Sequence, residues 1–163
     1  MKTKQLIFLL LMFSACYTNS SKNKVTHSQT VKRDYKLIID NVIKLYSTGT
    51  IVSVNDLQNA VPITQDEFSV YYSYTFPEKG KSIIETFYKV DTDIGKHAAE
   101  NHGDFLKLYL ELASFADGEY AESYFEDVDF VIAKNKNVFC KIYPSLSKQS
   151  KMRLEEYTGQ YCK

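Results

Sequence analysis

The sequence predicts an all-α fold, a compact helical bundle or a small stack of helical hairpins, with about six to eight helices. Apolar side chains recur at intervals of three and four residues through most of the chain after residue 33. Short stretches with Gly, Pro or polar residues separate these segments. The segment 68–76 also alternates like a strand, but no partner strand is visible elsewhere. The helical spacing, the short connecting stretches and the lack of a partner strand favour helices packed on helices.

The first helices are marked by their ends. Residues 34–46 carry apolar side chains on one face, and Gly49 follows as a stop signal. Ser53 is expected to cap a short helix that ends at Ala60, because Pro62 interrupts any continuation. Two helices joined by a short loop are therefore expected before residue 63.

The next segment is ambiguous, and the choice depends on its cap. Thr64 and Glu67 match a capping box, which predicts that a helix begins here. Residues 68–76 alternate like a half-buried strand, although Phe68, Tyr71 and Tyr72 also share a helical face. We choose a helix because of the cap. Residues 77–80, with Pro and Gly, then turn the chain.

Three longer segments follow. Residues 81–100 have a helical pattern with Ile83, Ile84, Phe87 and Tyr88 on one face, and Gly95 is placed to interrupt it. Residues 104–116 are apolar almost all round, which is typical of a central, buried helix. After the turn at Asp117 and Gly118, residues 119–134 turn aromatic and aliphatic side chains inward and acidic side chains toward water.

The last segments hold two cysteines. A short helix with Cys140 is expected to stop at Pro144, and Ser147 opens a basic last helix with Leu154 facing inward. In an antiparallel hairpin, Cys162 would lie roughly 15 Å beyond the position opposite Cys140. A disulfide needs Cα atoms within about 7 Å, so a buried free Cys140 is the favoured interpretation. A bridge requires the last helix to end early or fold back.

The first residues look like an export signal. Lys2 and Lys4 precede the apolar residues 6–13, and the small residues Ser14 and Ala15 follow. Eight apolar residues span only about 12 Å as a helix, well short of the roughly 30 Å hydrocarbon core of a bilayer. A charged start, a brief apolar centre and a small-residue exit are typical of a cleaved secretory signal.

The end of this leader adds a lipid anchor to the expectation. Phe13-Ser14-Ala15-Cys16 resembles the lipobox of bacterial lipoproteins, with Phe13 where leucine is usual. The resemblance implies that signal peptidase II cuts before Cys16 after its sulfur has received a diacylglycerol. The protein would then stay on the membrane of a bacterial cell envelope, with its domain in the periplasm or at the cell surface. The alternative is an ordinary secretory signal in which Cys16 is incidental.

These signals divide the chain into three parts. Residues 1–15 form the signal peptide, residues 16–32 form the lipidated cysteine and a polar tether, and residues 33–163 form a single helical domain. Removing Lys2 and Lys4 from 20 basic side chains leaves 18 against 20 acidic ones. This balance argues against nucleic acid as a partner.

The sequence shows no pattern for catalysis, a metal or a cofactor. His97, Glu100, His102 and Asp104 come nearest to a metal cluster, but their spacing places no tetrahedral set on one face. The Asp-rich start at 91–95 lacks the glycine and the last acidic ligand of a calcium loop. We therefore expect neither a metal nor a cofactor.

A protein-binding role is the functional hypothesis that remains. The candidate partner-binding residues are Glu119, Glu122, Glu126 and Asp127, which could steer a basic partner, although a merely solvated face has the same pattern. An immunity-type or inhibitor lipoprotein is one particular form of this role. The alternative is an envelope enzyme or small-ligand-binding protein with a pocket between helices near His97 or His102. Tyr71, Tyr72, Tyr74 and Tyr88 suggest an aromatic platform, for which core packing is the favoured alternative.

Overall fold

The structure is a computed structural model that describes residues 33–100 and 103–162, so the predicted leader, Cys16 and the tether lie outside the described residues. Within these ranges it contains helices and no strand, which confirms the all-α class. Its eight α-helices are α1 Tyr35–Ser47, α2 Val54–Ala60, α3 Gln65–Tyr72, α4 Lys81–Glu100, α5 Asp104–Glu111, α6 Gly118–Ile142, α7 Lys148–Arg153 and α8 Glu155–Tyr161. Short 3-10 turns follow α3, α5 and α6.

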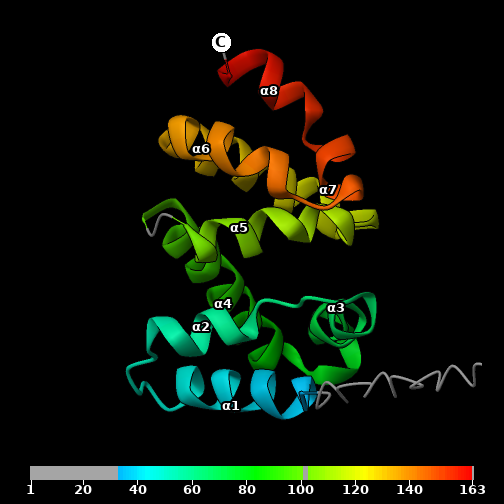
Figure 1. The fold of residues 1–163 in the computed structure, drawn as a ribbon. Coiled ribbons are helices and arrows are strands. Elements are labelled where there is room, and N and C mark those ends of the chain that lie inside the picture. Colours follow the sequence, from blue (N-terminus) through cyan, green and yellow to red (C-terminus); the bar gives the residue numbers. More distant parts are fainter. Residues whose placement is uncertain (1–32, 101–102, 163) are drawn as a thin grey trace, which may run out of the picture. The chain divides into compact units, whose positions relative to one another are not determined.

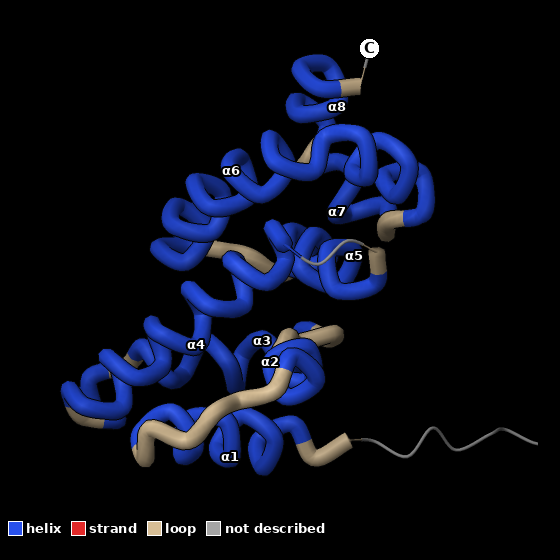
Figure 2. Tube along the Cα trace, turned by 90° about the vertical axis from the view of Figure 1, so that its left-hand side faces the viewer, coloured by secondary structure: helices blue, strands red, loops and turns tan. Residues whose placement is uncertain are grey.

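The long helix α4 organises the domain. It packs against α1, α2 and the 3-10 turn that follows α3, and it also packs against α5 and α6 (Figures 1 and 2). Helix α8 lies on α6. The other helices are therefore stacked in layers along α4. No helix in the described ranges is both long enough and apolar enough to cross a bilayer.

The start of the domain is fixed by one arginine. Arg33 donates through Nε to Glu67 at 2.7 Å and through its Nη atoms to the carbonyls of Asn59 and Val61. Glu67 also accepts from the backbone amide of Ile63 at 2.7 Å. Burial by itself raises the pKa of Glu67, but the hydrogen bonds from Arg33 and Ile63 outweigh it and lower the pKa below its usual value. This clamp joins the beginning of α1 to α2 and α3.

The helix prediction for the ambiguous segment is confirmed. The Thr64 side chain accepts from the amide of Glu67 and caps α3, and a 3-10 turn, Ser73–Thr75, continues it. Phe68, Tyr71 and Tyr74 are buried. The cap favours a helix because the Thr64 side chain satisfies a backbone N–H at the start of α3. In a strand, this N–H would need an acceptor on a neighbouring strand.

Two expectations for α4 are wrong. The helix runs through Gly95 without a break. The hydroxyl of Tyr109 lies 3.5 Å from where a Cβ would stand at Gly95, an ordinary van der Waals distance, so the packing of α5 here does not depend on the glycine. Ile83 and Tyr88 are exposed, whereas Phe87 is buried. The apolar stripe continues from Phe87 through Val90 and Ile94 instead.

The separate helices expected at residues 119–134 and around Cys140 are one helix, α6, with a kink between them. Asn135 has φ −118° and ψ 22°, and the helix continues on both sides. The buried Asn135 amide donates to the carbonyls of Ala99 and Val131 at 2.9 and 3.0 Å. The side chain thus ties the end of α4 to the bend in α6.

The interpretation of Cys140 as a free buried thiol is wrong. Cys140 and Cys162 form a disulfide with their Cα atoms 5.5 Å apart. The straight last helix assumed from the sequence is divided at Leu154, which ends α7 and precedes α8. Because α8 turns back onto α6, Cys162 reaches Cys140.

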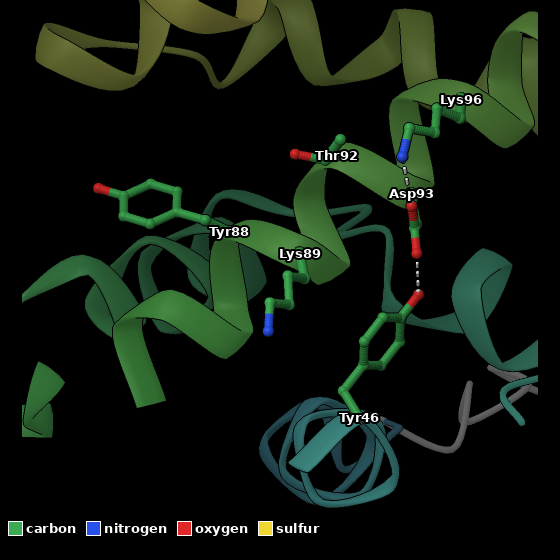
Figure 3. A pocket seen from close by; sticks show the side chains of 6 residues that line it. All are labelled: Tyr46, Tyr88, Lys89, Thr92, Asp93 and Lys96. Carbon is green, nitrogen blue, oxygen red and sulfur yellow. Dashed lines mark hydrogen bonds and ion pairs between the residues drawn. The ribbon is translucent and has the colours of Figure 1, made fainter. Parts of the chain in front are cut away.

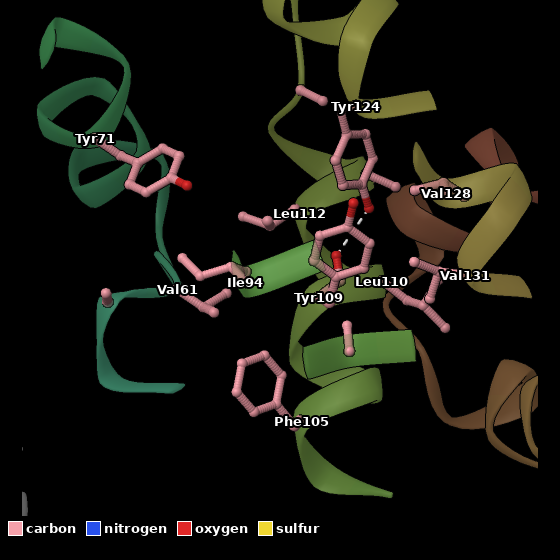
Figure 4. Packing of buried hydrophobic residues seen from close by; sticks show 14 of the residues in the cluster. Val61, Tyr71, Ile94, Phe105, Tyr109, Leu110, Leu112, Tyr124, Val128 and Val131 are labelled. Carbon is pink, nitrogen blue, oxygen red and sulfur yellow. Dashed lines mark hydrogen bonds between the residues drawn. The ribbon is translucent and has the colours of Figure 1, made fainter. Parts of the chain in front are cut away.

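The core is built largely from aromatic and aliphatic side chains of α4, α5 and α6. Helix α5 is buried on most of its surface, through Phe105, Leu106, Tyr109 and Leu110, as its uninterrupted apolar pattern predicts. Figure 4 shows Tyr124 of α6 beside Tyr109, and its hydroxyl donates to the Tyr109 carbonyl at 2.8 Å. The Tyr124 hydroxyl thus finds its hydrogen-bond partner within the core.

Candidate functional site

The predicted acidic residues lie together on the exposed face of α6. Glu119, Glu122 and Glu126 follow one another at helical spacing, and the half-exposed ring of Phe130 continues the stripe. The side chain of Lys134 covers part of this ring, with Nζ 4.5 Å from its centroid. Within the described ranges no ion pair reaches these three glutamates. We call Glu119, Glu122, Glu126 and Phe130 the acidic face.

Asp127 lies at the edge of this face and has different surroundings. It lines a small depression of about 210 Å³ together with Lys96 and Phe130. Partial burial raises the pKa of Asp127, and the neighbouring charge of Glu126 raises it further. Asp127 therefore lies at the rim of the depression between α4 and α6, although its side chain is exposed like those of the three glutamates.

The sequence did not indicate a groove at the beginning of α6. Rings and polar side chains of α3 and its following turn form one wall, and the first residues of α6 form the other. The lining residues are Gln65, Phe68, Ser69, Tyr72, Phe76, Asp117 and Gly118. The groove has a volume of about 410 Å³ and is open to solvent. We call it the aromatic groove.

The rings of the aromatic groove support one another. Phe68 and Tyr72 are stacked with centroids 6.2 Å apart, and the edge of Phe76 meets Tyr72 at 5.4 Å. Phe68 is buried beneath the groove, whereas Phe76 is 39% exposed. Tyr120 of α6 packs against Phe68 from inside, at 5.2 Å. The apolar lining is therefore anchored to the core, which makes it a preformed surface.

A second depression of about 520 Å³ adjoins the aromatic groove and shares Gln65 with it. Ile63, Leu108 and Phe115 supply its apolar surface. Its carboxylate, Glu111, is already engaged, because it accepts from the amide of Ser147 at 2.8 Å and from the hydroxyl of Ser150 at 2.6 Å. The contacts of Glu111 hold α7 onto α5. The depression itself continues the aromatic groove.

A different depression, of about 300 Å³, lies between α1 and α4 (Figure 3). Asp93 accepts from the Tyr46 hydroxyl at 2.9 Å and from Lys96 at 3.0 Å. Burial raises the pKa of Asp93 by itself, but these two partners outweigh it and lower the pKa. Tyr88 and Lys89 border the depression, and their side chains form no hydrogen bond or ion pair within the described ranges. The central contact is thus a structural link between two helices.

The four tyrosines of the predicted platform do not come together. Tyr71 and Tyr74 are buried, as the core alternative predicts. Tyr72 lines the aromatic groove, and Tyr88 lines the depression of Figure 3. Most other tyrosines donate their hydroxyl to an oxygen of the chain, whereas those of Tyr72 and Tyr88 have no partner among the described residues.

Within the described ranges four aspartates accept hydrogen bonds from tyrosine hydroxyls, and Asp91 is the most enclosed of them. Its Oδ1 accepts from Tyr71 at 2.5 Å and from Tyr120 at 3.1 Å, so it joins α3, α4 and α6. Burial raises the pKa of Asp91 above its ordinary value, and Asp127 opposes its ionisation further, although the two hydroxyls favour it. Tyr74 likewise donates to Asp40 on α1. We assign this network to stability.

Replacing Asp91 with asparagine tests that assignment. Between the unfolded-state pKa near 3.8 and the raised native pKa, the native protein binds more protons than the unfolded chain, so ionising Asp91 lowers stability as the pH rises. Asparagine keeps an oxygen acceptor and carries no charge. Urea unfolding from pH 4 to 7 should therefore show that the free energy of unfolding of Asp91→Asn rises relative to that of the wild type. The gain is about 1.4 kcal/mol for each factor of ten by which folding raises the proton affinity of Asp91. A difference independent of pH would contradict it.

The histidine cluster considered for a metal is not assembled in the described part of the chain. No group of three potential ligands converges there, and His102 lies outside the described residues. The ring of His97 packs near Phe105, with centroids 6.4 Å apart. His97 lines none of the four depressions described above. The alternative of a ligand pocket beside His97 therefore gains no support.

Comparison with known proteins adds no relative. Neither protein-family models, nor curated proteins, nor solved structures match this chain. The acidic face and the aromatic groove that begins beside it are therefore the features that indicate the function of this chain.

Proposed function

We propose that this chain is a lipoprotein of the bacterial cell envelope, anchored to the membrane through Cys16, and that its helical domain binds another protein. The acidic face of α6 would meet a basic surface of that partner. An immunity-type or inhibitor protein, which neutralises an incoming toxin, is the particular form that we favour. The observation that carries the proposal is the row of exposed glutamates on α6, which form no ion pair with any described residue.

Helix stability explains only the first of these glutamates. Glu119 lies in the first turn of α6, where a negative charge interacts favourably with the helix dipole. Glu122 and Glu126 lie further along and four residues apart, so their mutual repulsion costs a few tenths of a kcal/mol. No described lysine or arginine pairs with them. Their charges are therefore directed outward and suit a basic partner.

The disulfide supports the predicted location. Disulfides persist in oxidising compartments such as the bacterial periplasm and are rare in the cytosol. The bond between Cys140 and Cys162 agrees with a chain that is exported before it folds. Export and the lipid anchor are independent, so the anchor needs its own test.

Charge reversal on α6 tests the binding role. Affinity capture from the native envelope with the full-length protein should recover a partner, and Glu122→Lys combined with Glu126→Lys should weaken that complex at least tenfold, as should raising the salt from about 0.05 to 0.5 M. The double variant should remain folded, because both side chains are exposed and neither forms an ion pair within the described part of the chain. A complex insensitive to charge and salt, or no complex, would exclude the proposal.

A matched control separates a local contact from overall charge. Glu78→Lys with Glu85→Lys makes the same change in net charge on two other exposed residues and should leave binding unchanged; Glu78 lies in the 3-10 turn Pro77–Lys79, and Glu85 lies on α4, where it pairs with Lys81 at 3.7 Å. The anchor is tested in parallel by Cys16→Ala, which should move the protein from the membrane fraction to the soluble fraction.

A further inference from the structure

The aromatic groove adjoins the acidic face, and this juxtaposition limits what a partner can insert there. Gly118, which lines the groove, directly precedes Glu119, the first residue of the acidic face. A partner whose basic residues lie along α6 would therefore reach the groove at the beginning of the same helix. We propose that the groove receives a short segment of the protein partner in which apolar side chains stand beside a lysine or arginine. This inference rests on the proposed function and assigns the partner's contact chemistry.

The apolar part of the segment is set by the rings. Phe76 exposes 39% of its surface beside Tyr72, and Phe68 closes the groove from below. A volume of about 410 Å³ is within the range of roughly 300–1,000 Å³ that ligand pockets occupy, and it exceeds what a single side chain fills. Apolar or aromatic side chains from the partner would remove these exposed rings from water.

The polar part of the groove is suited to a peptide backbone. The Tyr72 hydroxyl has no partner within the described ranges, unlike the hydroxyls of Tyr71 and Tyr120, which are held by Asp91. The hydroxyl of Ser69 is turned back to the carbonyl of Gln65 at 3.0 Å. Tyr72 is thus one side chain of the groove that can bind an incoming amide or carbonyl without breaking an internal hydrogen bond.

The charge of the groove favours a cation. Asp117 lines it, caps α6 through the amide of Gly118 at 2.7 Å, and has no ion pair among the described residues. No lysine or arginine lines the aromatic groove. A partner's ammonium or guanidinium group can approach Asp117 while lying against the face of Tyr72 or Phe76, an arrangement that adds a cation–π contribution. An acidic segment would meet only repulsion there.

Binding of three labelled hexapeptides to the full-length protein tests this inference by fluorescence anisotropy. The first is Gly-Lys-Leu-Phe-Lys-Gly, the second replaces both lysines with glutamate, and the third replaces the leucine and phenylalanine with serine. The first peptide should bind at least tenfold more tightly than either of the others. Equal binding of the acidic peptide would overturn the charge assignment, and equal binding of the serine peptide would overturn the apolar assignment.

Variants locate the peptide. Phe76→Ala and Asp117→Asn should each weaken the first peptide at least fivefold; asparagine preserves the cap of α6. The controls are Ile83→Ala, which is equally exposed on α4, and Asp34→Asn, which removes the charge from another helix cap; neither should change binding. Circular dichroism confirms that each variant is folded.

The outcomes separate this inference from the proposed function. If Glu122→Lys with Glu126→Lys abolishes peptide binding while Phe76→Ala leaves it unchanged, the acidic face alone binds and the groove assignment is wrong. If no peptide binds at millimolar concentration, or if a second copy of this chain occupies the groove and blocks it, the inference fails. In either case, affinity capture from the native envelope still tests the proposed function independently of the peptide experiment.

Discussion

Replacing Phe87 with alanine is expected to lower the free energy of unfolding by about 3–5 kcal/mol. Phe87 is fully buried on α4, its ring lies 4.7 Å from that of Tyr71 and 6.1 Å from that of Tyr74, and it therefore joins α4 to α3 and its following turn. Truncation leaves a cavity at the point where these elements meet. Since domains of this size are stable by about 5–15 kcal/mol, this single change would remove a large share of the total.

The neighbouring residue provides the control. Tyr88 follows Phe87 on the same helix but is 53% exposed, so Tyr88→Ala should change stability by no more than about 0.5 kcal/mol. Urea unfolding followed by circular dichroism measures both. Phe87→Leu, which leaves a smaller void, keeps the test informative if the alanine variant does not fold. Equal losses at positions 87 and 88 would contradict the packing described for α4.

Removing the disulfide is expected to destabilise the domain by about 3 kcal/mol. Cys140 and Cys162 are separated by 22 residues, and closing a loop of this length restricts the unfolded chain by about that amount. The bond also holds α8 against the second part of α6. The double variant Cys140→Ser with Cys162→Ser should therefore unfold at lower urea concentration than the oxidised wild type.

Reduction provides the matching comparison. A reducing agent should bring the wild type down to the stability of the double serine variant and leave that variant unchanged. If the oxidised wild type and the variant unfold at the same urea concentration, the bond does not restrain the native domain as described.

The sequence predicted the elements whose signals are local. Ser53 and Thr64 cap helices where expected, because a cap is a contact between residues three apart. The uninterrupted apolar pattern of residues 104–116 predicted the burial of α5. The acidic face followed from helical spacing in the same way. Each of these features is determined within about one or two turns of chain.

The features that the sequence missed depend on contacts between distant segments. The disulfide was judged on a straight last helix, whereas the chain leaves helical geometry at Leu154 as α8 packs onto α6. The aromatic groove joins Phe76 to Asp117, which no local pattern connects. The only sequence signal for this groove was the number of aromatic side chains in residues 68–76, which is larger than one buried helix face can hold.

The most direct test of the binding role is photo-crosslinking in the native envelope from position 123. Ser123 is exposed on α6 between Glu122 and Tyr124, and a photoreactive residue there would touch whatever covers the acidic face. We expect a discrete crosslinked protein that disappears when Glu122 and Glu126 are both changed to lysine, and that is absent when the probe stands at exposed Ser82. No crosslink at 123, or the same product from both positions, would contradict the account.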